Sequence, residues 1–347
     1  MKIRHRWRVE RGAFSPRGIR WQPFAPGSTN RLWRGAGPSG DWLLKWYKYP
    51  RAGVHPEPEV GRFLGKCGFP GVPEFGARLD QAGAGGFETV AYIQRWVSGQ
   101  AAWDVAVDAL REGASLTVWA TGLGRRVGAL HSALATGGGP VGSAGSAFAV
   151  VPYSVQHHEQ WVKRVSGVGQ RLAEALRNAP PREVPSGAWE KARSVWLGGE
   201  VRWRERVESL RSLRVSGSCS RVHGDLHLGQ ILQTGRGVSE SHWWVVDFEG
   251  EPLRPLEERR APDLPLRDVA GMWRSFEYAV ATAGVAPERA RPLQEAFLEG
   301  WIERMSLPQD GWKGLLEGLV WEKAIYEALY EIEHRPGWLW IPLRALA

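Results

Sequence analysis

The sequence predicts an α+β protein in which a small strand-rich part precedes a larger, mainly helical part. In residues 1–98, short apolar runs alternate with clusters of Gly, Pro, Asn and Ser, which is the pattern of strands joined by turns. Farther along, apolar residues recur at helical spacing, as Leu123, Val127 and Leu130 do. The chain has 347 residues, which is enough for two domains. We expect the first domain to comprise residues 1–98 and the second residues 99–347.

Composition narrows the functional classes. The formal net charge is +8, but the longest basic cluster, residues 1–8, is short and mixed with apolar residues. We therefore expect no nucleic acid among the partners. With two cysteines the chain has neither a disulfide framework nor a paired-cysteine metal site. No apolar run is long enough to form a secretion signal or to span a bilayer. A cytoplasmic protein without a membrane partner is expected.

A small, turn-prone loop, APGSTN at residues 25–30, lies near the start of the chain. Strand-like runs flank it at residues 18–24 and 31–34. Backbone N–H groups in such a loop can bind phosphate groups, so Ser28 and Thr29 are candidate phosphate contacts. An ordinary hairpin turn is the alternative interpretation.

The next expected strand, residues 41–48, carries two lysines that could bind a phosphate, Lys45 and the alternative Lys48. A helix should follow it. Pro58 suits the first helical position, apolar residues then recur at helical spacing, and Gly and Pro end the segment. Two acidic residues near its start could pair with the strand lysine. Glu59 is the first candidate and Glu57 the second.

Residues 88–97 are expected to form a strand that leads to a hinge between the domains at residues 98–100. The chain beyond is mostly helical. His131, on one of these helices, is expected to be a satisfied core or surface histidine rather than a ligand. Residues 136–146 are rich in Gly and Ser and are expected to be mobile, and the Pro- and charge-rich residues 254–266 are expected to be irregular.

Two strings near the middle of the chain are the most informative: HGDLHLGQ at residues 223–230 and DFEGEP at residues 247–252. The segment between them predicts two strands joined by a turn, so the hairpin would place both acidic loops side by side. Phosphoryl transfer needs an aspartate to deprotonate the attacking hydroxyl, and oxygen ligands for Mg²⁺. In the catalytic loop of protein kinases the base is an aspartate in an H-x-D context, which matches Asp225. The candidate metal ligands are Gln230, Asp247 and Glu249. Turn caps, or a pseudokinase that keeps only the fold, are the alternatives.

In this order and spacing, the two strings resemble those of aminoglycoside phosphotransferase-like kinases. They resemble more narrowly the bacterial maltokinase family, whose close relatives act on amino sugars. HPEPEV at residues 55–60 and GFPGVPEFG at residues 68–76 add to this resemblance. It covers about residues 25–347. It implies a protein kinase-like fold with a small antiparallel-sheet N-lobe, a larger helical C-lobe and an active site in the cleft between them. The implied cofactors are ATP and Mg²⁺.

The resemblance also implies roles for residues outside the two strings. Lys45, steadied by Glu59, would hold the phosphates of ATP. Backbone groups at the hinge would bind adenine. His223 and Asp268 would support the catalytic loop. For Asp268, an ordinary carboxylate stabilised at a helix N-terminus is an equally good interpretation.

The segment of residues 321–338 is expected to form a helix. It would place Glu327 and Glu331 one turn apart, and likewise Tyr326 and Tyr330. Carboxylates and phenols can hydrogen-bond to sugar hydroxyls, and the rings can stack on a sugar. The segment resembles the sugar-binding helix of maltokinases, although an amphipathic helix with buried tyrosines would fit as well. The expected sugar-binding residues are His227, Tyr326, Glu327, Tyr330, Glu331 and Trp338.

The expected function is ATP-dependent phosphorylation of a sugar hydroxyl, with maltose as the first acceptor. Glucosamine or another amino sugar is the alternative, followed by an aminoglycoside or a small alcohol. A non-catalytic nucleotide- or sugar-binding module belongs to a different functional class. Family members usually carry an N-terminal cap of many tens of residues, whereas about 25 residues precede the phosphate loop here. This departure leaves the acceptor open, and the sequence does not indicate an oligomeric state.

Overall fold

The structure of the chain is a computed structural model that describes most of the residues. The expected phosphate loop, with Ser28 and Thr29, lies outside the described residues, and so does most of the Gly- and Ser-rich segment, residues 137–146. The described residues are 7–11 (main chain only), 14–15, 17–24, 30–83, 86–136, 147–178, 180, 184, 186–235, 242–252, 254–305 and 311–347.

The chain forms two compact units, and their boundary differs from the predicted one. The first unit comprises residues 1–105, 223–225 and 229–261, and the second contains the rest. The segment of residues 229–261, which we assigned to the second domain, thus belongs with the N-terminal sheet. The reason is hydrogen bonding, because strand β7 (Gln100–Ala101) pairs with β10 (Ile231–Thr234) in an antiparallel register.

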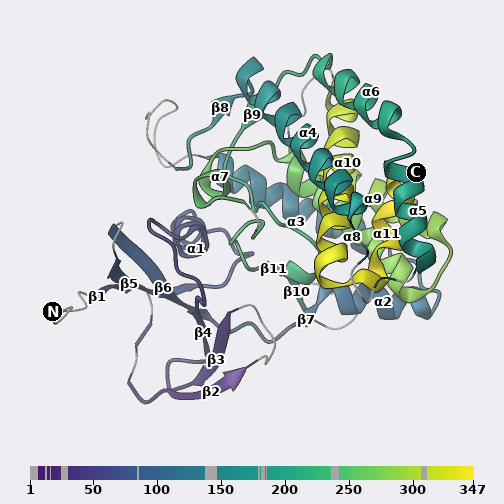
Figure 1. Cartoon of the computed structure of the whole chain (residues 1–347). Coiled ribbons are helices and arrows are strands. Elements are labelled where there is room, and N and C mark those ends of the chain that lie inside the picture. Colours follow the sequence, from purple (N-terminus) through teal and green to yellow (C-terminus); the bar gives the residue numbers. More distant parts are fainter. Residues whose placement is uncertain are drawn as a thin grey trace. The chain divides into compact units, whose positions relative to one another are not determined.

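The first unit contains the antiparallel sheet that the sequence predicts. Among the described residues six strands form it, in the order β1-β5-β6-β4-β3-β2 (Figure 1). Neighbouring strands pair antiparallel throughout. The strand bounds are β1 Trp7–Arg11, β2 Arg20–Phe24, β3 Arg31–Ala36, β4 Trp42–Trp46, β5 Phe75–Gly83 and β6 Gly86–Arg95.

The main helix of this unit, α1 (Pro56–Lys66), begins two residues earlier than expected. His55 is the N-cap residue, and its ring nitrogen Nδ1 accepts a hydrogen bond from the main-chain N–H of Glu57 at 3.3 Å. A cap of this kind satisfies one of the N–H groups that the first turn leaves without a helical partner. Glu57 lies on the same buried face of α1 as Val60 and Leu64, and it contacts Lys45 of β4.

The hairpin predicted between the two acidic strings is present. Strand β10 pairs with β11 (His242–Val245), and the short helix η1 (Leu228–Gln230) precedes it. The next segment, expected to be irregular, contains the short helix α7 (Leu256–Arg260). Acidic residues in its first turn and arginines in its last turn complement the helix dipole, and Leu256 is buried, which explains the turn of helix.

The second unit is mainly helical, as expected, and α2 leads into it from the first unit (Figure 1). A two-stranded pairing of β8 (Val151–Pro152) with β9 (Ser218–Cys219) accompanies the helices. The helices are α2 Ala102–Arg111, α3 Thr117–Ala135, α4 Val155–Arg177, α5 Ser186–Trp196, α6 Glu200–Arg211, α8 Leu266–Ala283, η2 Pro287–Arg289, α9 Ala290–Ile302, α10 Trp312–His334, η3 Pro336–Trp338 and α11 Trp340–Leu346.

Helices α3 and α9 approach each other very closely, and glycines make this possible. A Cβ atom at Gly124 would lie 2.0 Å from the carbonyl oxygen of Phe297, and one at Gly300 would lie 2.0 Å from that of Thr121. Leu123 on α3 is fully buried, as its place in the predicted apolar stripe requires. The two helices therefore form a tightly packed part of the core of the second unit.

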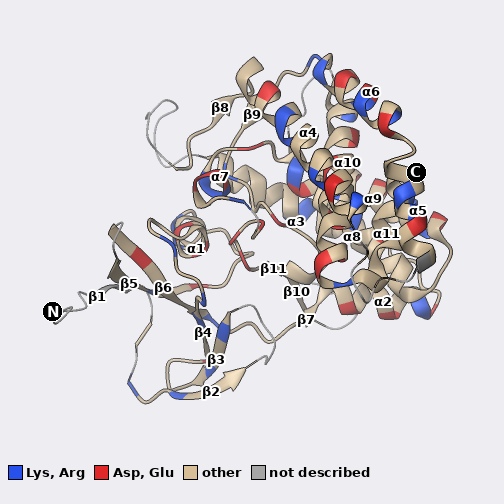
Figure 2. Ribbon diagram, viewed as in Figure 1, with Lys and Arg blue, Asp and Glu red and all other residues tan. Residues whose placement is uncertain are grey.

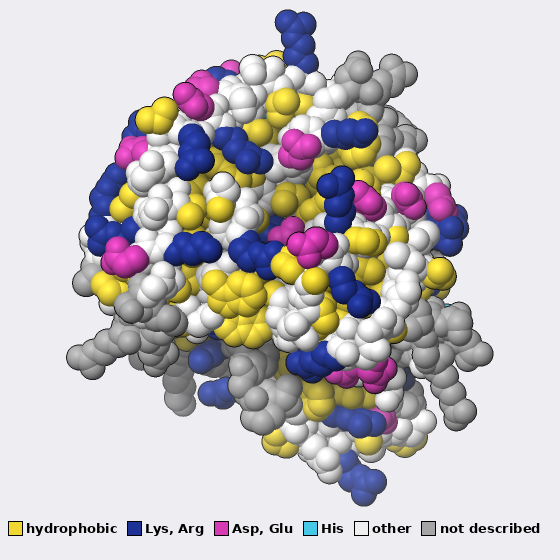
Figure 3. All heavy atoms as spheres, turned by 90° about the vertical axis from the view of Figure 1, so that its right-hand side faces the viewer, with side chains coloured by type: hydrophobic (Ala, Val, Ile, Leu, Met, Phe, Trp, Pro, Cys, Tyr) yellow, Lys and Arg dark blue, Asp and Glu magenta, His cyan; other side chains and the backbone are white. Residues whose placement is uncertain are grey.

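Charged side chains are spread over the molecule. Figure 2 shows basic and acidic residues interspersed along helices such as α4 and α6. On the face shown in Figure 3, Lys and Arg side chains lie singly or in small groups among hydrophobic and acidic ones rather than in a continuous stripe. Of the helices that the structure describes, none combines the length and the apolar character needed to cross a membrane.

Candidate active site

Lys45 lies on β4 and is buried among three carboxylates of the first unit. Its Nζ atom is 2.5 Å from Oδ1 of Asp247 and 3.1 Å from Oε2 of Glu57, and it also contacts Glu249. Burial alone would lower the pKa of Lys45, but the three negative charges outweigh burial and hold this pKa well above its ordinary value. Lys45 is therefore a charged group in a largely water-excluded place.

The correct partner of Lys45 on α1 is Glu57, and the prediction of Glu59 was wrong. Glu59 pairs with Arg260 of α7 instead, at 2.7 Å. Residues two positions apart lie about 200° apart around a helix, so both glutamates cannot point at the same strand. The alternative lysine, Lys48, is exposed, and its Nζ atom lies 5.5 Å from the ring centroid of Tyr49.

Asp247 is held in an unusual backbone conformation directly after the hairpin. Its φ of 68° lies in the left-handed region, which non-glycine residues rarely adopt. One oxygen contacts Lys45, and the other accepts a hydrogen bond from Nε2 of Gln230 at 3.1 Å. Burial would raise the pKa of Asp247, but Lys45 dominates and lowers this pKa to about 2. The carboxylate is thus ionised at neutral pH, and its strained backbone is typical of functional positions.

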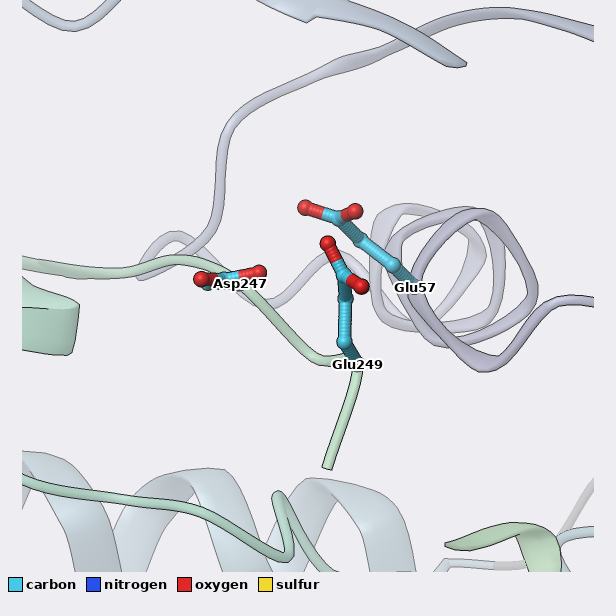
Figure 4. Close-up of side chains that lie close together, drawn as sticks. All are labelled: Glu57, Asp247 and Glu249. Carbon is cyan, nitrogen blue, oxygen red and sulfur yellow. The ribbon is translucent and has the colours of Figure 1, made fainter. Parts of the chain in front are cut away.

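Three carboxylates of this unit converge. One oxygen each of Glu57, Asp247 and Glu249 lies within 4.8 Å of the others, and the side chains point toward one another from α1 and from the segment after β11 (Figure 4). Burial, followed by repulsion from the other two carboxylates, raises the pKa of Glu57 to about 8 despite the opposing charge of Lys45. Burial likewise raises the pKa of Glu249. The two glutamates therefore hold their protons more readily than free carboxyl groups do, because each is buried beside other carboxylates.

His223 joins the two acidic loops. Its Nδ1 atom accepts a hydrogen bond from the main-chain N–H of Asp225 at 3.3 Å, and Nε2 lies 2.9 Å from the carbonyl oxygen of Val246. Since a carbonyl can only accept, Nε2 carries the proton and donates it. Gly224 has a φ of 86°, which explains a glycine there. His223 thus fixes the loop of Asp225 relative to the residue before Asp247, and Asp225 itself is half-buried.

The structure also shows contributors that the sequence did not indicate. Asn30 Nδ2 donates a hydrogen bond to Oε1 of Glu249 at 2.7 Å, and Tyr47 donates its hydroxyl proton to Oε2 of Glu57 at 2.7 Å. Asn30 and Glu249 are separated by 219 positions in the sequence, so no local pattern could indicate this contact. The HPEPEV string, which carries part of the family resemblance, also contains the N-cap residue His55.

The sheet face that carries Lys45 also carries apolar and aromatic side chains. In the strand register, Phe24 pairs with Leu32 and Leu32 with Lys45, so their side chains lie on the same face. Phe24 contacts Trp96 edge to face, with ring centroids 4.7 Å apart, and the guanidinium of Arg34 lies 4.8 Å from the centroid of Trp96. An aromatic and apolar surface therefore borders the lysine.

The predicted hinge segment lies beside a cavity of the first unit. Strand β6 ends at Arg95 and β7 begins at Gln100. The cavity has a volume of about 440 Å³ and is lined by Ser98, Gly99, Gln100, Val105, Gln233, Thr234 and Gly235. A Cβ at Gly99 would lie 2.7 Å from the carbonyl oxygen of Gln233, so the chain can approach β10 here only as glycine.

In the second unit, the predicted sugar-binding carboxylates of α10 are paired with arginines. Oε2 of Glu327 accepts a hydrogen bond from Nε of Arg274 at 2.8 Å, and Arg274 also contacts Glu277. Glu331 is buried and bonds to Arg335 at 2.7 Å and to the hydroxyl of Tyr278 at 3.0 Å. Burial raises the pKa of Glu327, against the lowering effect of Arg274.

The predicted aromatic residues lie near these pairs within the second unit. Trp338 stacks on Tyr278 with ring centroids 6.2 Å apart, and Tyr330 stacks on His334 at 4.4 Å. Tyr326 lies 4.8 Å from Nζ of Lys323, measured to its ring centroid. The aromatic side chains therefore contact neighbours of the same unit. The alternative of an amphipathic helix that only packs against its own unit allows for such contacts.

Asp268 is oriented by a buried chain of hydrogen bonds. Its Oδ2 atom lies 2.9 Å from Nε2 of His131, and Nδ1 of His131 accepts the indole proton of Trp301 at 2.9 Å. The proton of the neutral ring is thus on Nε2 and is donated to Asp268. His131 is fully buried and makes both bonds, which confirms that it is a satisfied core histidine.

The same helix contacts the chain just after Asp225. A Cβ at Gly271 would lie 2.4 Å from the carbonyl oxygen of Leu226, and the main-chain N–H of Leu228 donates a hydrogen bond to Oγ of Ser275 at 3.0 Å. His227, between these two residues, is half-buried. Helix α8 therefore holds the segment of residues 226–228 within the second unit.

Comparisons with known proteins found a family match and related sequences. The sequence profile of the "Phosphotransferase enzyme family" matches residues 20–301. A glucosamine kinase from Streptacidiphilus jiangxiensis is 26% identical over 323 residues, which cover 86% of this chain and 67% of that protein. A glucosamine kinase from Mycolicibacterium smegmatis is 30% identical over 137 residues, which cover 36% of this chain and 33% of that protein.

Two solved structures show the fold. The structure of a glucosamine kinase in complex with glucosamine, ADP and inorganic phosphate matches with a TM-score of 0.73 at 22% identity, and the match covers 98% of this chain and 78% of that one. The structure of an amicoumacin kinase in complex with AMP-PNP, Ca²⁺ and Ami matches with a TM-score of 0.55 at 14% identity, covering 96% of this chain and 89% of that one. These matches confirm the predicted kinase-like α+β fold.

Proposed function

Because the chain belongs to the phosphotransferase enzyme family, we propose that it transfers the γ-phosphoryl group of ATP to a hydroxyl group of an amino sugar. Two of its relatives are glucosamine kinases, and a similar structure contains glucosamine, ADP and inorganic phosphate. These similarities support glucosamine as the first acceptor to test. They favour it over maltose, the acceptor expected from the sequence strings, which becomes the second.

The observation that carries the proposal is the charge balance around Lys45. One ammonium group faces the carboxyl groups of Glu57, Asp247 and Glu249, so the cluster has a net charge of −2 when all three are ionised (+1 and −3) and of −1 when Glu57 is protonated (+1 and −2). Hard oxygen donors of this kind suit Mg²⁺. Since Glu57 forms an ion pair with Lys45, the residues that fit Mg²⁺ are Asp247, Glu249 and Gln230. When bound, Mg²⁺ would neutralise charge on the nucleotide phosphates.

Asp225 is the residue that would accept the proton of the acceptor hydroxyl. As that oxygen bonds to the γ-phosphorus of ATP, the bond from this phosphorus to the β,γ-bridging oxygen breaks and ADP leaves. The His223 bridge supports this role, because it fixes the main chain of Asp225 relative to the segment that carries Asp247. Lys45 would hold the phosphates once they compete with the carboxylates for its ammonium group.

The sheet face beside Lys45 supports nucleotide binding. Leu32 and Leu43 are half-buried on this face, and Phe24 and Trp96 extend it away from the lysine. A purine base needs such an apolar and aromatic surface, with polar main-chain groups at its edge. The hinge residues that follow Trp96 would provide those main-chain groups.

The second unit provides charge that suits a cationic acceptor. Arg274 contacts two carboxylates, Glu277 and Glu327, and Lys323 is a second cation that acts on Glu327. Arg335 neutralises Glu331. An amino sugar carries an ammonium group at neutral pH, and carboxylates such as Glu277 and Glu327 can bind it more strongly than they bind a neutral sugar.

The test is a panel of acceptors with ATP and Mg²⁺, followed by phosphorus NMR of the product. Glucose is the matched control for glucosamine, because it replaces the amino group with a hydroxyl. We expect kcat/KM for glucosamine to exceed that for glucose by about tenfold or more, as a lost charged hydrogen bond implies. Equal rates with both, or a preference for maltose or an aminoglycoside, would contradict the proposed acceptor. Nucleotide binding without turnover on any acceptor would support a non-catalytic module.

A further inference from the structure

Tyr47 is a buried tyrosine of the first unit that touches the partner of Lys45. It directly follows β4, and its main-chain N–H extends the sheet by donating to the carbonyl oxygen of Val90 at 3.0 Å. Its hydroxyl donates to Oε2 of Glu57 at 2.7 Å. The same carboxylate oxygen lies 3.1 Å from Nζ of Lys45. One oxygen atom of Glu57 thus receives both the tyrosine and the lysine.

The other side of Tyr47 holds the start of α1. The phenol ring stacks on the imidazole of His55, with ring centroids 3.8 Å apart and an interplanar angle of 21°. His55 is the N-cap residue, and its Nδ1 atom accepts the main-chain N–H of Glu57. Tyr47 therefore constrains the side chain of Glu57 directly and its main chain through His55.

Two features explain why Glu57 needs this support. The connection from β4 to α1 contains no regular helix or strand apart from isolated bridges near Ala52 and Gly53, so it does not fix the helix start by itself. Glu57 is also repelled by the nearby carboxylates of Asp247 and Glu249. A neutral hydroxyl donor offsets this repulsion without adding charge. Burial raises the pKa of Tyr47 well above its ordinary value, so the hydroxyl keeps its proton.

We propose that Tyr47 is a positioning residue for nucleotide binding. Its hydroxyl fixes the carboxylate of Glu57, and Glu57 in turn fixes the ammonium group of Lys45 where the nucleotide phosphates bind. The inference rests on the proposed function, because it assigns Lys45 to those phosphates. A purely structural role of Tyr47 is the competing explanation, and it predicts a loss of stability without a selective loss of nucleotide affinity.

The test compares Tyr47→Phe with the control Tyr49→Phe. Tyr47→Phe removes the hydroxyl and keeps the ring on His55, whereas Tyr49 is 77% exposed. We expect Tyr47→Phe to raise both the Kd of Mg-ATP, measured by titration calorimetry, and the KM for ATP about tenfold, which is the size expected for a hydrogen bond to a charged group. The KM for the acceptor should stay within about twofold. Tyr49→Phe should leave all three constants unchanged.

A double-mutant cycle with Glu57→Gln separates positioning from stability. If Tyr47 acts through Glu57, Tyr47→Phe should change the Kd of Mg-ATP by less than about twofold in the Glu57→Gln background. As a second variant, His55→Asn keeps a capping side chain and removes the stacked ring, and it should raise the KM for ATP in the same selective way.

Three outcomes would overturn the inference. The first is an unchanged Kd in Tyr47→Phe. The second is the same fold-loss in the Glu57→Gln background as in the wild type. The third is an equal rise in the KM values of nucleotide and acceptor. If the wild-type chain itself failed to bind Mg-ATP, the proposed function would fail first, and that result is distinct because it appears without any substitution.

Discussion

Lys45 holds the candidate site together, since its ammonium group is the counter-charge for three carboxylates. Lys45→Met keeps much of the side-chain volume but leaves those carboxylates unpaired in a buried place. Breaking a buried ion pair costs about 3–5 kcal/mol, so the melting temperature should fall and the affinity for Mg-ATP should be lost. Mg²⁺ alone should restore part of the stability. Thermal melts with and without Mg²⁺ measure this, with the exposed Lys48→Met as the control. Equal melting temperatures for both variants would contradict the account.

Asp225 is expected to act on the proton of the acceptor and not on the binding of nucleotide. Asp225→Asn should therefore lower kcat by about a hundred- to ten-thousand-fold, while the Kd of Mg-ATP stays near the wild-type value. Steady-state kinetics and titration calorimetry give the two numbers, and Asp108→Asn, at an exposed site on α2, is the matched control. Near-normal turnover of Asp225→Asn would remove this residue from the role of base.

The raised pKa of Glu57 gives the nucleotide-free protein a defined pH dependence. A carboxyl group whose pKa is higher in the folded state favours folding only while it is protonated. Its contribution is therefore lost as the pH rises from its ordinary pKa, 4.5, to its folded pKa of about 8. Glu57→Gln should remove this loss and flatten the stability profile over that window. Denaturant unfolding at several pH values measures it, and an unchanged slope would contradict the assignment.

At the scale of elements, the prediction of Glu59 failed for a geometric reason. The sequence predicts the helix and its acidic first turn with Pro58 as the first helical residue, whereas α1 begins at Pro56. The side chains of Glu57 and Glu59 lie about 200° apart around the helix. Glu57, the second candidate, shares the buried stripe of Val60 and Leu64, but a helix that begins at Pro58 leaves Glu57 outside it.

Other contacts of the candidate site could not be predicted from any local sequence pattern. Asn30 bonds to Glu249 across 219 residues, and Lys45 to Asp247 across 202. The hairpin itself was predictable, because its strands and turn are contiguous. Its membership in the first unit was not, because that depends on pairing with β7. The sequence therefore identified the chemical groups of the site, whereas their supporting partners became visible only in three dimensions.

The crossing of α3 and α9 gives a prediction about packing. Gly124→Ala would place a Cβ 2.0 Å from the carbonyl oxygen of Phe297, so the helices must separate, at a cost of about 1–3 kcal/mol or more. Gly167→Ala on α4 is the control, since no atom lies within 4 Å of the added Cβ, and it should stabilise the helix by up to about 1 kcal/mol. Denaturant unfolding measures both variants. A Gly124→Ala variant with an unchanged free energy of unfolding would disprove the close contact.

At the scale of the whole molecule, nucleotide binding should appear as stability. A ligand that binds only the folded chain stabilises it by about 2.7 kcal/mol at a concentration of a hundred times Kd. Mg-ADP should therefore raise the melting temperature of the wild type in a concentration-dependent manner. Asp247→Asn removes a negative charge from the proposed metal ligands, so it should lose most of this rise. An equal rise in both proteins would place the nucleotide elsewhere.

The family match, which spans residues 20–301, and the convergence of carboxylates in the first unit are independent observations. The match indicates phosphoryl transfer, and the convergence indicates where the charge of a metal–nucleotide complex would be compensated. The acceptor is a separate question. We propose that it depends on the carboxylate–arginine pairs of α8 and α10, and the glucosamine kinases among the relatives are the present guide to it.

The most direct test of the central claim is a crystal structure of the chain with Mn²⁺ and a non-hydrolysable ATP analogue, with Mn²⁺ located by its anomalous scattering. The account predicts an anomalous peak at the side-chain oxygens of Asp247 and Gln230, with Nζ of Lys45 moved onto a phosphate oxygen. A peak away from Asp247, or a nucleotide whose phosphates do not contact Lys45, would contradict it.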